Sequence, residues 1–176
     1  MTNHIPPATE VLVVADCWSA EADADAIIHR AIEAASAMVK DDTADAELAV
    51  MLTDDAGIRT LNNNWRGIDK ATNVLSFPAL QPPEGAAVPD DMPRMLGDIA
   101  IAYQTTRREA DDEEKPFANH LSHLAVHGFL HLVGYDHEND GDAEDMEQLE
   151  REILLTLGIP DPYADRDPHT DQDKVT

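Results

Sequence analysis

The feature that most constrains this chain is the run from His127 to His137, which contains three histidines and two glycines. His127 and His131 are four residues apart, so on a helix they lie on the same face. Gly134 can adopt the left-handed conformation that ends a helix, which lets the chain turn and bring His137 back to the pair. Three neutral imidazoles suit a borderline-soft divalent cation, most often zinc. The run therefore predicts a metal site with a fourth position open to water, as in catalytic zinc sites.

His123 is the competing third ligand, because it lies one further turn back on the same helix face. A helix rises roughly 12 Å over the eight residues from His123 to His131, whereas zinc requires nitrogens at about 2.1 Å. A straight helix does not bring three successive histidines to one ion. We therefore expect His123, like His120, to lie beside the ligands or in core hydrogen bonds.

The spacing of the histidines matches the long zincin pattern H-x-x-x-H-x-x-G-x-x-H, with one departure. In metallopeptidases the residue after the first histidine is a glutamate that activates the water. Here that residue is Gly128, which has no side chain. The sequence thus predicts a zincin-like metal site without the peptidase base, and a peptidase is the weakest of the functions that the site allows.

The segment HGFLHLVGYDH resembles the signature of the YbeY family of bacterial single-domain metalloproteins. The resemblance continues in the order of the family through three further segments, which are Trp65–Pro78, Leu96–Ile101 and Asp142–Glu150. It implies a small α/β sandwich and a single-strand-specific endoribonuclease that acts in rRNA processing, namely 3′-end maturation of small-subunit rRNA, and in ribosome quality control. It also implies one zinc ion per chain, with another divalent transition metal as the alternative. The implied partners are rRNA, the small ribosomal subunit and assembly proteins such as the GTPase Era.

A formal net charge of −24 opposes binding to a phosphate backbone, because affinity for nucleic acids normally comes from lysine and arginine. The stretch from residue 56 to residue 83 is the exception, since its only acid is Asp69 and it contains Arg59, Arg66 and Lys70. The guanidinium of Arg66 matches the geometry of a phosphate. The resemblance also treats this arginine as functional, so we predict Arg66 and His127 as catalytic residues.

Several other residues are predicted to support the site. Arg59, Lys70 and Asn73 are predicted, with Arg66, to bind substrate, although Asn73 can equally hold its loop in place. His123, Asp136 and Asp98 are candidates for orienting a histidine ligand through its second ring nitrogen. Trp65 stands where the family pattern usually has tyrosine or phenylalanine; it can stack on a base, but we expect it to be buried in its helix.

Hydrophobic periodicity predicts an α/β (α+β) fold, a small and mostly parallel four-stranded sheet with the metal-bearing helix packed against it. The predicted strands cover residues 11–15, 47–53, 73–77 and 95–103, and we expect the last of them to run antiparallel at an edge. The predicted helices cover residues 21–40, 54–66, 104–110, 116–133 and 140–157. Residues 79–94 form a flexible proline-rich loop.

The chain of 176 residues is most simply one domain over residues 1–163, followed by a disordered acidic tail over residues 164–176. A single cysteine, Cys17, fits a reducing compartment. There is no secretory signal and no apolar run long enough to span a membrane. We therefore expect a cytoplasmic protein.

Two functions remain in competition at this point. The first is the metal-dependent endoribonuclease, which requires Arg66 on the same side of the molecule as the three histidines. The second is a non-catalytic, metal-stabilised ribosome assembly factor whose acidic faces bind basic proteins, and the net charge of −24 favours it. An Arg66 on the far side from the histidines would favour it as well.

Overall fold

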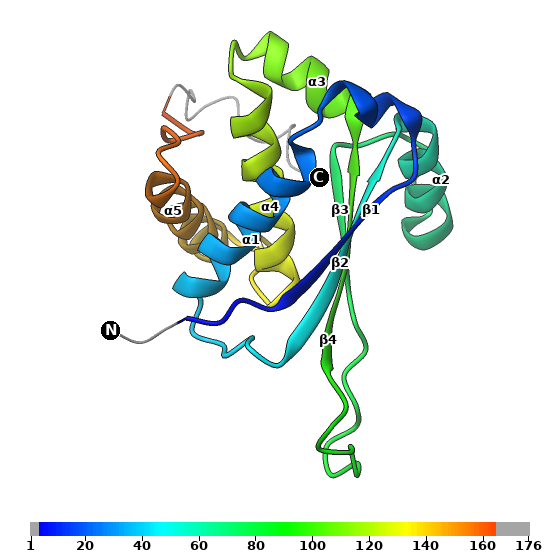
Figure 1. The fold of residues 1–176 in the computed structure, drawn as a ribbon, viewed down its shortest axis with the longest axis vertical. Coiled ribbons are helices and arrows are strands. Elements are labelled where there is room, and N and C mark those ends of the chain that lie inside the picture. Colours follow the sequence, from blue (N-terminus) through cyan, green and yellow to red (C-terminus); the bar gives the residue numbers. More distant parts are fainter. Residues whose placement is uncertain (1–3, 165–176) are drawn as a thin grey trace.

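The computed structural model describes residues 4–164, which form one four-stranded sheet surrounded by helices (Figure 1). The strands are β1 (Ala8–Val13), β2 (Ala46–Thr53), β3 (Val74–Pro78) and β4 (Arg94–Ala102). The helices are the 3-10 helix η1 (Asp16–Ala20) and the α-helices α1 (Ala24–Met38), α2 (Asp55–Arg66), α3 (Tyr103–Asp112), α4 (Phe117–Leu132) and α5 (Asp140–Thr156). The mixed α/β class and the helix packed on the sheet are as predicted.

The strands are ordered β1-β2-β4-β3, with β1, β2 and β4 parallel and β3 antiparallel to β4. The expectation that the last strand is the antiparallel edge strand is therefore wrong. The long connection after β3 returns the chain beside it, so β4 runs the opposite way and continues the parallel sheet next to β2. The antiparallel edge strand is β3.

Successive side chains of the central strands point to opposite faces of the sheet, and each face carries its own hydrophobic layer. Leu48, Val50 and Leu52 of β2 are buried in the larger core, together with residues of α1 and α4. Helix α5 packs against α1 and α4 on the outer side of this layer (Figure 1). Within residues 4–164, α2 is the helix that packs on the opposite face, where its Ile58 contacts Leu75 of β3 in a smaller cluster.

Helix α4 is the most buried helix because it lies between the sheet and the other helices. Its fully buried residues include Leu121, Phe129 and Leu130. Pro116, which we predicted to be its first helical residue, is instead its N-cap, and the helix begins one residue later at Phe117. This burial fixes the helix that carries His127 and His131.

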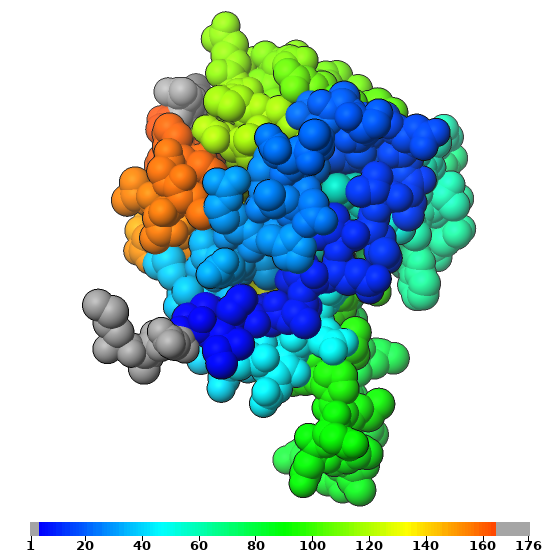
Figure 2. All heavy atoms as spheres, viewed as in Figure 1, coloured from blue at the N-terminus to red at the C-terminus, as the bar shows by residue number. Residues whose placement is uncertain are grey.

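The connection between β3 and β4 extends from the body of the molecule as an arm (Figures 1 and 2). It contains no helix or strand over residues 79–93, and its Leu80 side chain is fully exposed. Whether the arm is flexible remains a prediction. Residues 165–176 of the predicted tail lie outside the described residues. Among residues 4–164 no helix combines the length and apolar character needed to cross a bilayer.

Candidate metal centre

His127, His131 and His137 come together at the C-terminal end of α4. One ligand nitrogen from each lies within 4.8 Å of the other two. His127 and His131 are on adjacent turns of the helix, and their Nε2 atoms are 3.1 Å apart. The chain reverses at Gly134, which has a φ of +102°, and the His137 ring then lies 5.1 Å from the His131 ring. The turn that the sequence predicted is present.

The spacing of these nitrogens fits a metal ion. Ligands at about 2.1 Å from a tetrahedral zinc ion lie about 3.4 Å from one another, close to the 3.1 Å between the Nε2 atoms of His127 and His131. All three imidazoles are half-buried. Such a nitrogen set is typical of zinc and related transition metals, so these residues fit the group that they were predicted to hold.

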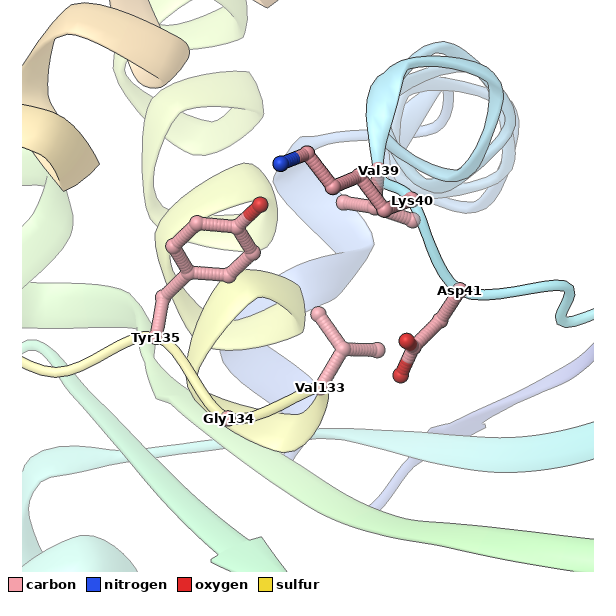
Figure 3. A pocket seen from close by; sticks show the side chains of 6 residues that line it. All are labelled: Val39, Lys40, Asp41, Val133, Gly134 and Tyr135. Carbon is pink, nitrogen blue, oxygen red and sulfur yellow. The ribbon is translucent and has the colours of Figure 1, made fainter.

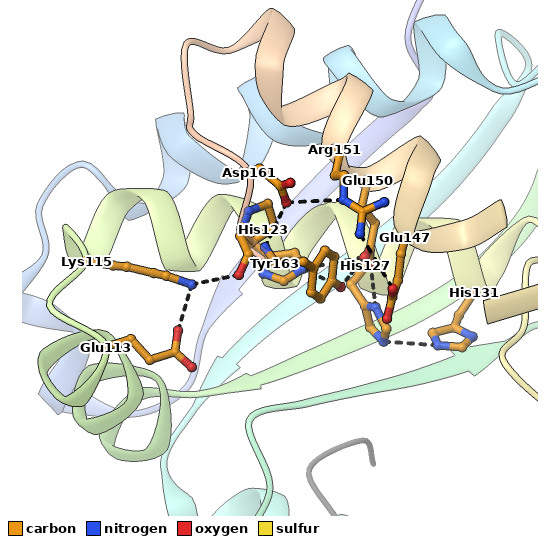
Figure 4. Close-up of polar contacts among 11 residues, drawn as sticks. Glu113, Lys115, His123, His127, His131, Glu147, Glu150, Arg151, Asp161 and Tyr163 are labelled. Atoms are coloured by element: carbon orange, nitrogen blue, oxygen red, sulfur yellow. Dashed lines mark hydrogen bonds and ion pairs between the residues drawn. The ribbon is translucent and has the colours of Figure 1, made fainter. Parts of the chain in front are cut away.

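A buried carboxylate lies directly behind the ligands. Glu150 of α5 is completely buried, and its Oε1 accepts a hydrogen bond from Nδ1 of His127 over 2.5 Å. Its Oε2 accepts a hydrogen bond from the hydroxyl of Tyr163 and lies 3.6 Å from Nε2 of His123 (Figure 4). His127 can therefore direct Nε2 at a metal while Nδ1 is fixed, which is the usual arrangement of a metal-binding histidine.

The ionisation of these groups follows from their surroundings. Burial alone would raise the pKa of Glu150, but hydrogen bonds from His123 and His127 hold that pKa well below its usual range. Burial, together with the nearby His127 and His137, lowers the pKa of His131 to about 4. At neutral pH, Glu150 is thus an anion and His131 a neutral imidazole that is ready to bind a metal.

The sequence reasoning missed Glu150. It lies among many acids of α5, and neither the metal motif nor the acidic composition distinguishes it. The signal that could have revealed it is helical spacing, since Glu150 shares the face of Met146 and Ile153, both of which are buried. A carboxylate on the buried face of a helix requires a partner, and His123 and His127 provide it.

Gly128 lies against the sheet and leaves no room for a side chain. A Cβ atom there would come within 2.9 Å of Cγ2 of Ile99 on β4 and 3.2 Å of Oγ of Ser76 on β3. The Ser76 hydroxyl also donates a hydrogen bond to the Gly128 carbonyl over 3.1 Å. The position that carries the general base in metallopeptidases is therefore used here for helix–sheet packing.

The three residues predicted to orient the ligands have different positions. His123 lies in the Glu150 network, as described. Asp136 accepts a hydrogen bond from the backbone N–H of His137 over 2.7 Å, so it fixes the chain at His137 and not an imidazole ring. Asp98 is exposed on β4, opposite Phe77 in the register and on the α2 side of the sheet. The expectation that Asp98 orients a ligand is therefore corrected.

Asn73 is held within the protein. Its amide donates to Oε1 of Glu109 over 3.0 Å, and its oxygen accepts from the backbone N–H of Val74. Nε2 of His120 lies 3.0 Å from the same Glu109 oxygen. Both polar groups of the Asn73 side chain thus have internal partners. This favours the structural alternative over the predicted contact with substrate.

The predicted basic residues lie on and after α2, on the opposite face of the sheet from α4. Arg59 forms a two-point ion pair with Asp69, with nitrogen–oxygen distances of 2.7 and 3.1 Å. Arg66 is the last residue of α2 and Lys70 follows it, and both are exposed. Helix α2 packs on the face of the sheet opposite α4, so Arg66 and the three histidines are carried by helices on opposite sides of the sheet.

A separate hollow lies beside the turn that follows α4 (Figure 3). It is lined by Val39, Lys40, Asp41, Val133, Gly134 and Tyr135. These residues include one cation, one anion and no histidine, which is not a set of ligands for a transition metal.

Comparison with known proteins agrees with this geometry. The model of the family described as endoribonuclease YbeY matches residues 15–158. Endoribonuclease YbeY of Rhodopseudomonas palustris strain BisB18 is 80% identical over 167 residues, covering 95% of this chain and 98% of the relative. Its counterpart in Bradyrhizobium diazoefficiens is 74% identical over 166 residues, covering 94% and 90% of the two chains.

A solution structure of a Thermotoga maritima protein has the same fold, with a TM-score of 0.52 over 91% of this chain and 97% of that one. Its sequence identity of 23% extends the likeness to the fold alone. The assignment rests instead on the family model and on the close relatives. The chain belongs to the endoribonuclease YbeY family.

Proposed function

We propose that this protein is a zinc-dependent endoribonuclease that cleaves single-stranded rRNA, with His127, His131 and His137 as the metal ligands. The observation that carries the proposal is the convergence of these three imidazoles, with two Nε2 atoms 3.1 Å apart, in a member of an endoribonuclease family. A bound zinc ion supplies a Lewis acid and a water of lowered pKa. Imidazole ligands also suit other transition metals, so metal identity is part of the test.

The surrounding residues keep the ligands in place. Glu150 fixes the ring of His127 through Nδ1, and Asp136 fixes the backbone at His137. Both nitrogens of His127 are engaged, one with Glu150 and the other toward His131. We therefore assign His127 to metal binding alone and do not assign it the role of a free general base.

Arg66 and Lys70 are assigned to the RNA backbone at a distance from the scissile phosphate. Both are exposed cations in a strongly acidic protein, and Asp69 is already paired with Arg59. We place Arg66 and Lys70 away from the scissile phosphate because α2 packs on the face of the sheet opposite α4. The proposed substrate is the 3′ region of small-subunit rRNA, and the proposed partners are the small subunit and assembly proteins such as the GTPase Era.

The non-catalytic assembly factor remains the second candidate, because two observations favour it. The net charge is −24, and Arg66 lies on the opposite face of the sheet from the histidines. In that case the metal stabilises the junction of α4 and α5, and the acidic faces bind basic proteins. The two candidates differ in whether the purified protein cleaves RNA.

The test compares wild type with His131→Ala and with His29→Ala, a matched control in which an exposed histidine of α1 is removed. Metal content is measured for each protein, and cleavage is followed on a single-stranded RNA and on its duplex. We expect wild type and His29→Ala to contain one metal ion and to cut the single strand. His131→Ala should lose both properties. Equal cleavage by His131→Ala would show that the activity comes from a contaminant.

A metal-loaded wild-type protein that binds the small subunit but leaves every RNA intact would establish the assembly factor instead. The ends of the RNA products report the chemistry further. A 2′,3′-cyclic phosphate identifies attack by the RNA's own 2′-hydroxyl, whereas a terminal phosphate monoester formed directly identifies attack by water.

A further inference from the structure

Trp65, near the end of α2, is exposed although the sequence predicted it to be buried. Its exposed fraction is 73%, whereas the other tryptophan of the chain, Trp18, has 2% and donates a hydrogen bond from its indole to the Thr53 carbonyl. Trp65 follows the completely buried Ile58 by seven residues on α2, so it shares that helix face and is nevertheless exposed. A large aromatic ring exposed to this degree is unusual in a folded protein.

One contact holds the Trp65 ring and leaves most of it free. The ring packs on Phe77 of β3, with centroids 6.0 Å apart and an angle of 56° between the planes. Phe77 therefore supports the indole from one side, while the remaining surface faces solvent. A supported aromatic ring with an open face is the element on which single-stranded nucleic acids stack their bases.

The cations around Trp65 suit a phosphate backbone. Arg66 and Lys70 are exposed, and among residues 4–164 neither forms an ion pair. The nearby acid, Asp69, is neutralised by Arg59 in a two-point ion pair. Elsewhere the protein is strongly acidic, so this is the part of the described surface where an anionic chain meets net positive charge.

The strand that supports Trp65 also contacts the helix of the metal centre. Phe77 faces α2, and its neighbour Ser76 faces α4, where its hydroxyl donates to the Gly128 carbonyl. Gly128 directly follows His127 in α4. Among residues 4–164 no second strand pairs with β3 on the side away from β4, and an RNA strand that passed over this outer edge would reach both faces of the sheet.

From this arrangement we infer that Trp65 is a stacking platform for one base of single-stranded RNA, with Arg66 and Lys70 on the neighbouring phosphates. The inference deepens the proposed endoribonuclease and rests on it. Trp65 holds the substrate at the edge of β3 and touches no reacting atom. It thus favours unpaired RNA, whose bases are free to stack, over a duplex, whose bases are not.

The test measures binding apart from cleavage, in the His131→Ala background. The ligands are a ten-nucleotide oligoadenylate and an abasic oligonucleotide of the same length, which keeps the phosphates but lacks the bases. Trp65→Ala, Trp65→Phe, Arg66→Ala and a control, Leu155→Ala, are compared. Leu155 is a similarly exposed apolar residue, 71% exposed, on the acidic helix α5.

Stacking on an aromatic residue contributes about 1–3 kcal/mol per base, so we expect Trp65→Ala to weaken oligoadenylate binding about 5- to 150-fold. The Trp65→Phe variant should recover part of the loss, and Leu155→Ala should bind as the parent does. For the abasic ligand, Trp65→Ala should change nothing, while Arg66→Ala should weaken both ligands. The oligoadenylate should also quench tryptophan emission in the parent protein but not in Trp65→Phe, whose remaining Trp18 is buried.

Unchanged affinity of Trp65→Ala for oligoadenylate, or equal losses for the two ligands, would overturn the inference. So would a Trp65 emission that responds to a basic ribosomal protein and not to the oligonucleotide, because the surface would then be a protein docking site. These binding results do not depend on whether the wild-type protein cleaves RNA. The stacking role of Trp65 and the proposed nuclease activity can therefore be refuted separately.

Discussion

Glu150 on α5 and His127 on α4 share a hydrogen bond of 2.5 Å between Oε1 and Nδ1, although 23 residues separate them in the sequence. The carboxylate is completely buried, so the contact serves both residues. His127 stabilises the buried charge of Glu150, and Glu150 orients the ring of His127. The metal centre is therefore built by two helices and not by the histidine motif alone.

The first prediction concerns this pair. Glu150→Gln keeps the size of the side chain but removes the charge that orients and polarises His127. Loss of such a partner typically weakens metal binding by about 10- to 100-fold, and we expect a change of that size in competition with a chromophoric chelator. The control is Glu144→Gln, an exposed position on the same helix. Equal affinities of the two variants would contradict the role of Glu150.

The second prediction concerns the pH dependence of the metal-free protein. The pKa of His131 is about 4 in the folded protein, below its ordinary value of 6.5. Between these values the unfolded chain binds more protons, so the free energy of unfolding falls as the pH decreases from about 6.5 toward 4. His131→Gln removes this contribution and should flatten the dependence. Urea denaturation of both proteins at pH 7 and pH 5 measures it, and parallel losses would rule out the lowered pKa.

The third prediction concerns the contact between α4 and the sheet. In Gly128→Ala the new methyl group meets Ile99 at 2.9 Å, and such overpacking typically costs about 1–3 kcal/mol of unfolding free energy. Gly141→Ala is the matched control, because that Cβ meets nothing closer than Asn139 Oδ1 at 3.4 Å. We expect urea denaturation to show a loss for the first variant only. A Gly128→Ala protein as stable as wild type would mean that α4 can move away from the sheet.

The fourth prediction concerns the acid within the basic surface. Asp69→Asn releases Arg59 from its ion pair and should strengthen binding of single-stranded RNA. If Arg59 then contacts one further phosphate, the slope of log K against log salt steepens by about 0.7. Asp25→Asn removes the same charge from an exposed site on α1, and its slope should stay at the wild-type value. Identical slopes for the two variants would exclude Arg59 from the RNA surface.

The features predicted correctly from the sequence are those that local backbone geometry determines. Helical spacing placed His127 and His131 on one face, and Gly134 indicated the reversal that brings His137 to them. The same reasoning located all four strands within a few residues. These features depend on neighbours in the sequence, which is why the sequence alone reveals them.

The errors concern contacts between distant segments. The position of β4 between β2 and β3 depends on the path of the long arm, which no local pattern encodes. Trp65 has the correct spacing for a buried residue, but burial depends on what packs over that point of α2, and helical spacing does not encode this. Asp98 was wrongly predicted to orient a histidine ligand, because the alternation of side chains along β4 directs it to the face of the sheet opposite α4. Glu150 was missed because its partner lies on another helix.

The dependence of His127 on Glu150 determines when the metal site can be completed during synthesis of the chain. A nascent chain that ends at His137 already contains all three nitrogen ligands, yet it lacks Glu150 and the Tyr163 hydroxyl that binds that carboxylate. The ribosome must make some two dozen further residues before the ligand set is supported. The ligands are therefore synthesised before the groups that fix them, and a chain shortened to His137 should bind metal more weakly than the full protein although it keeps all three imidazoles.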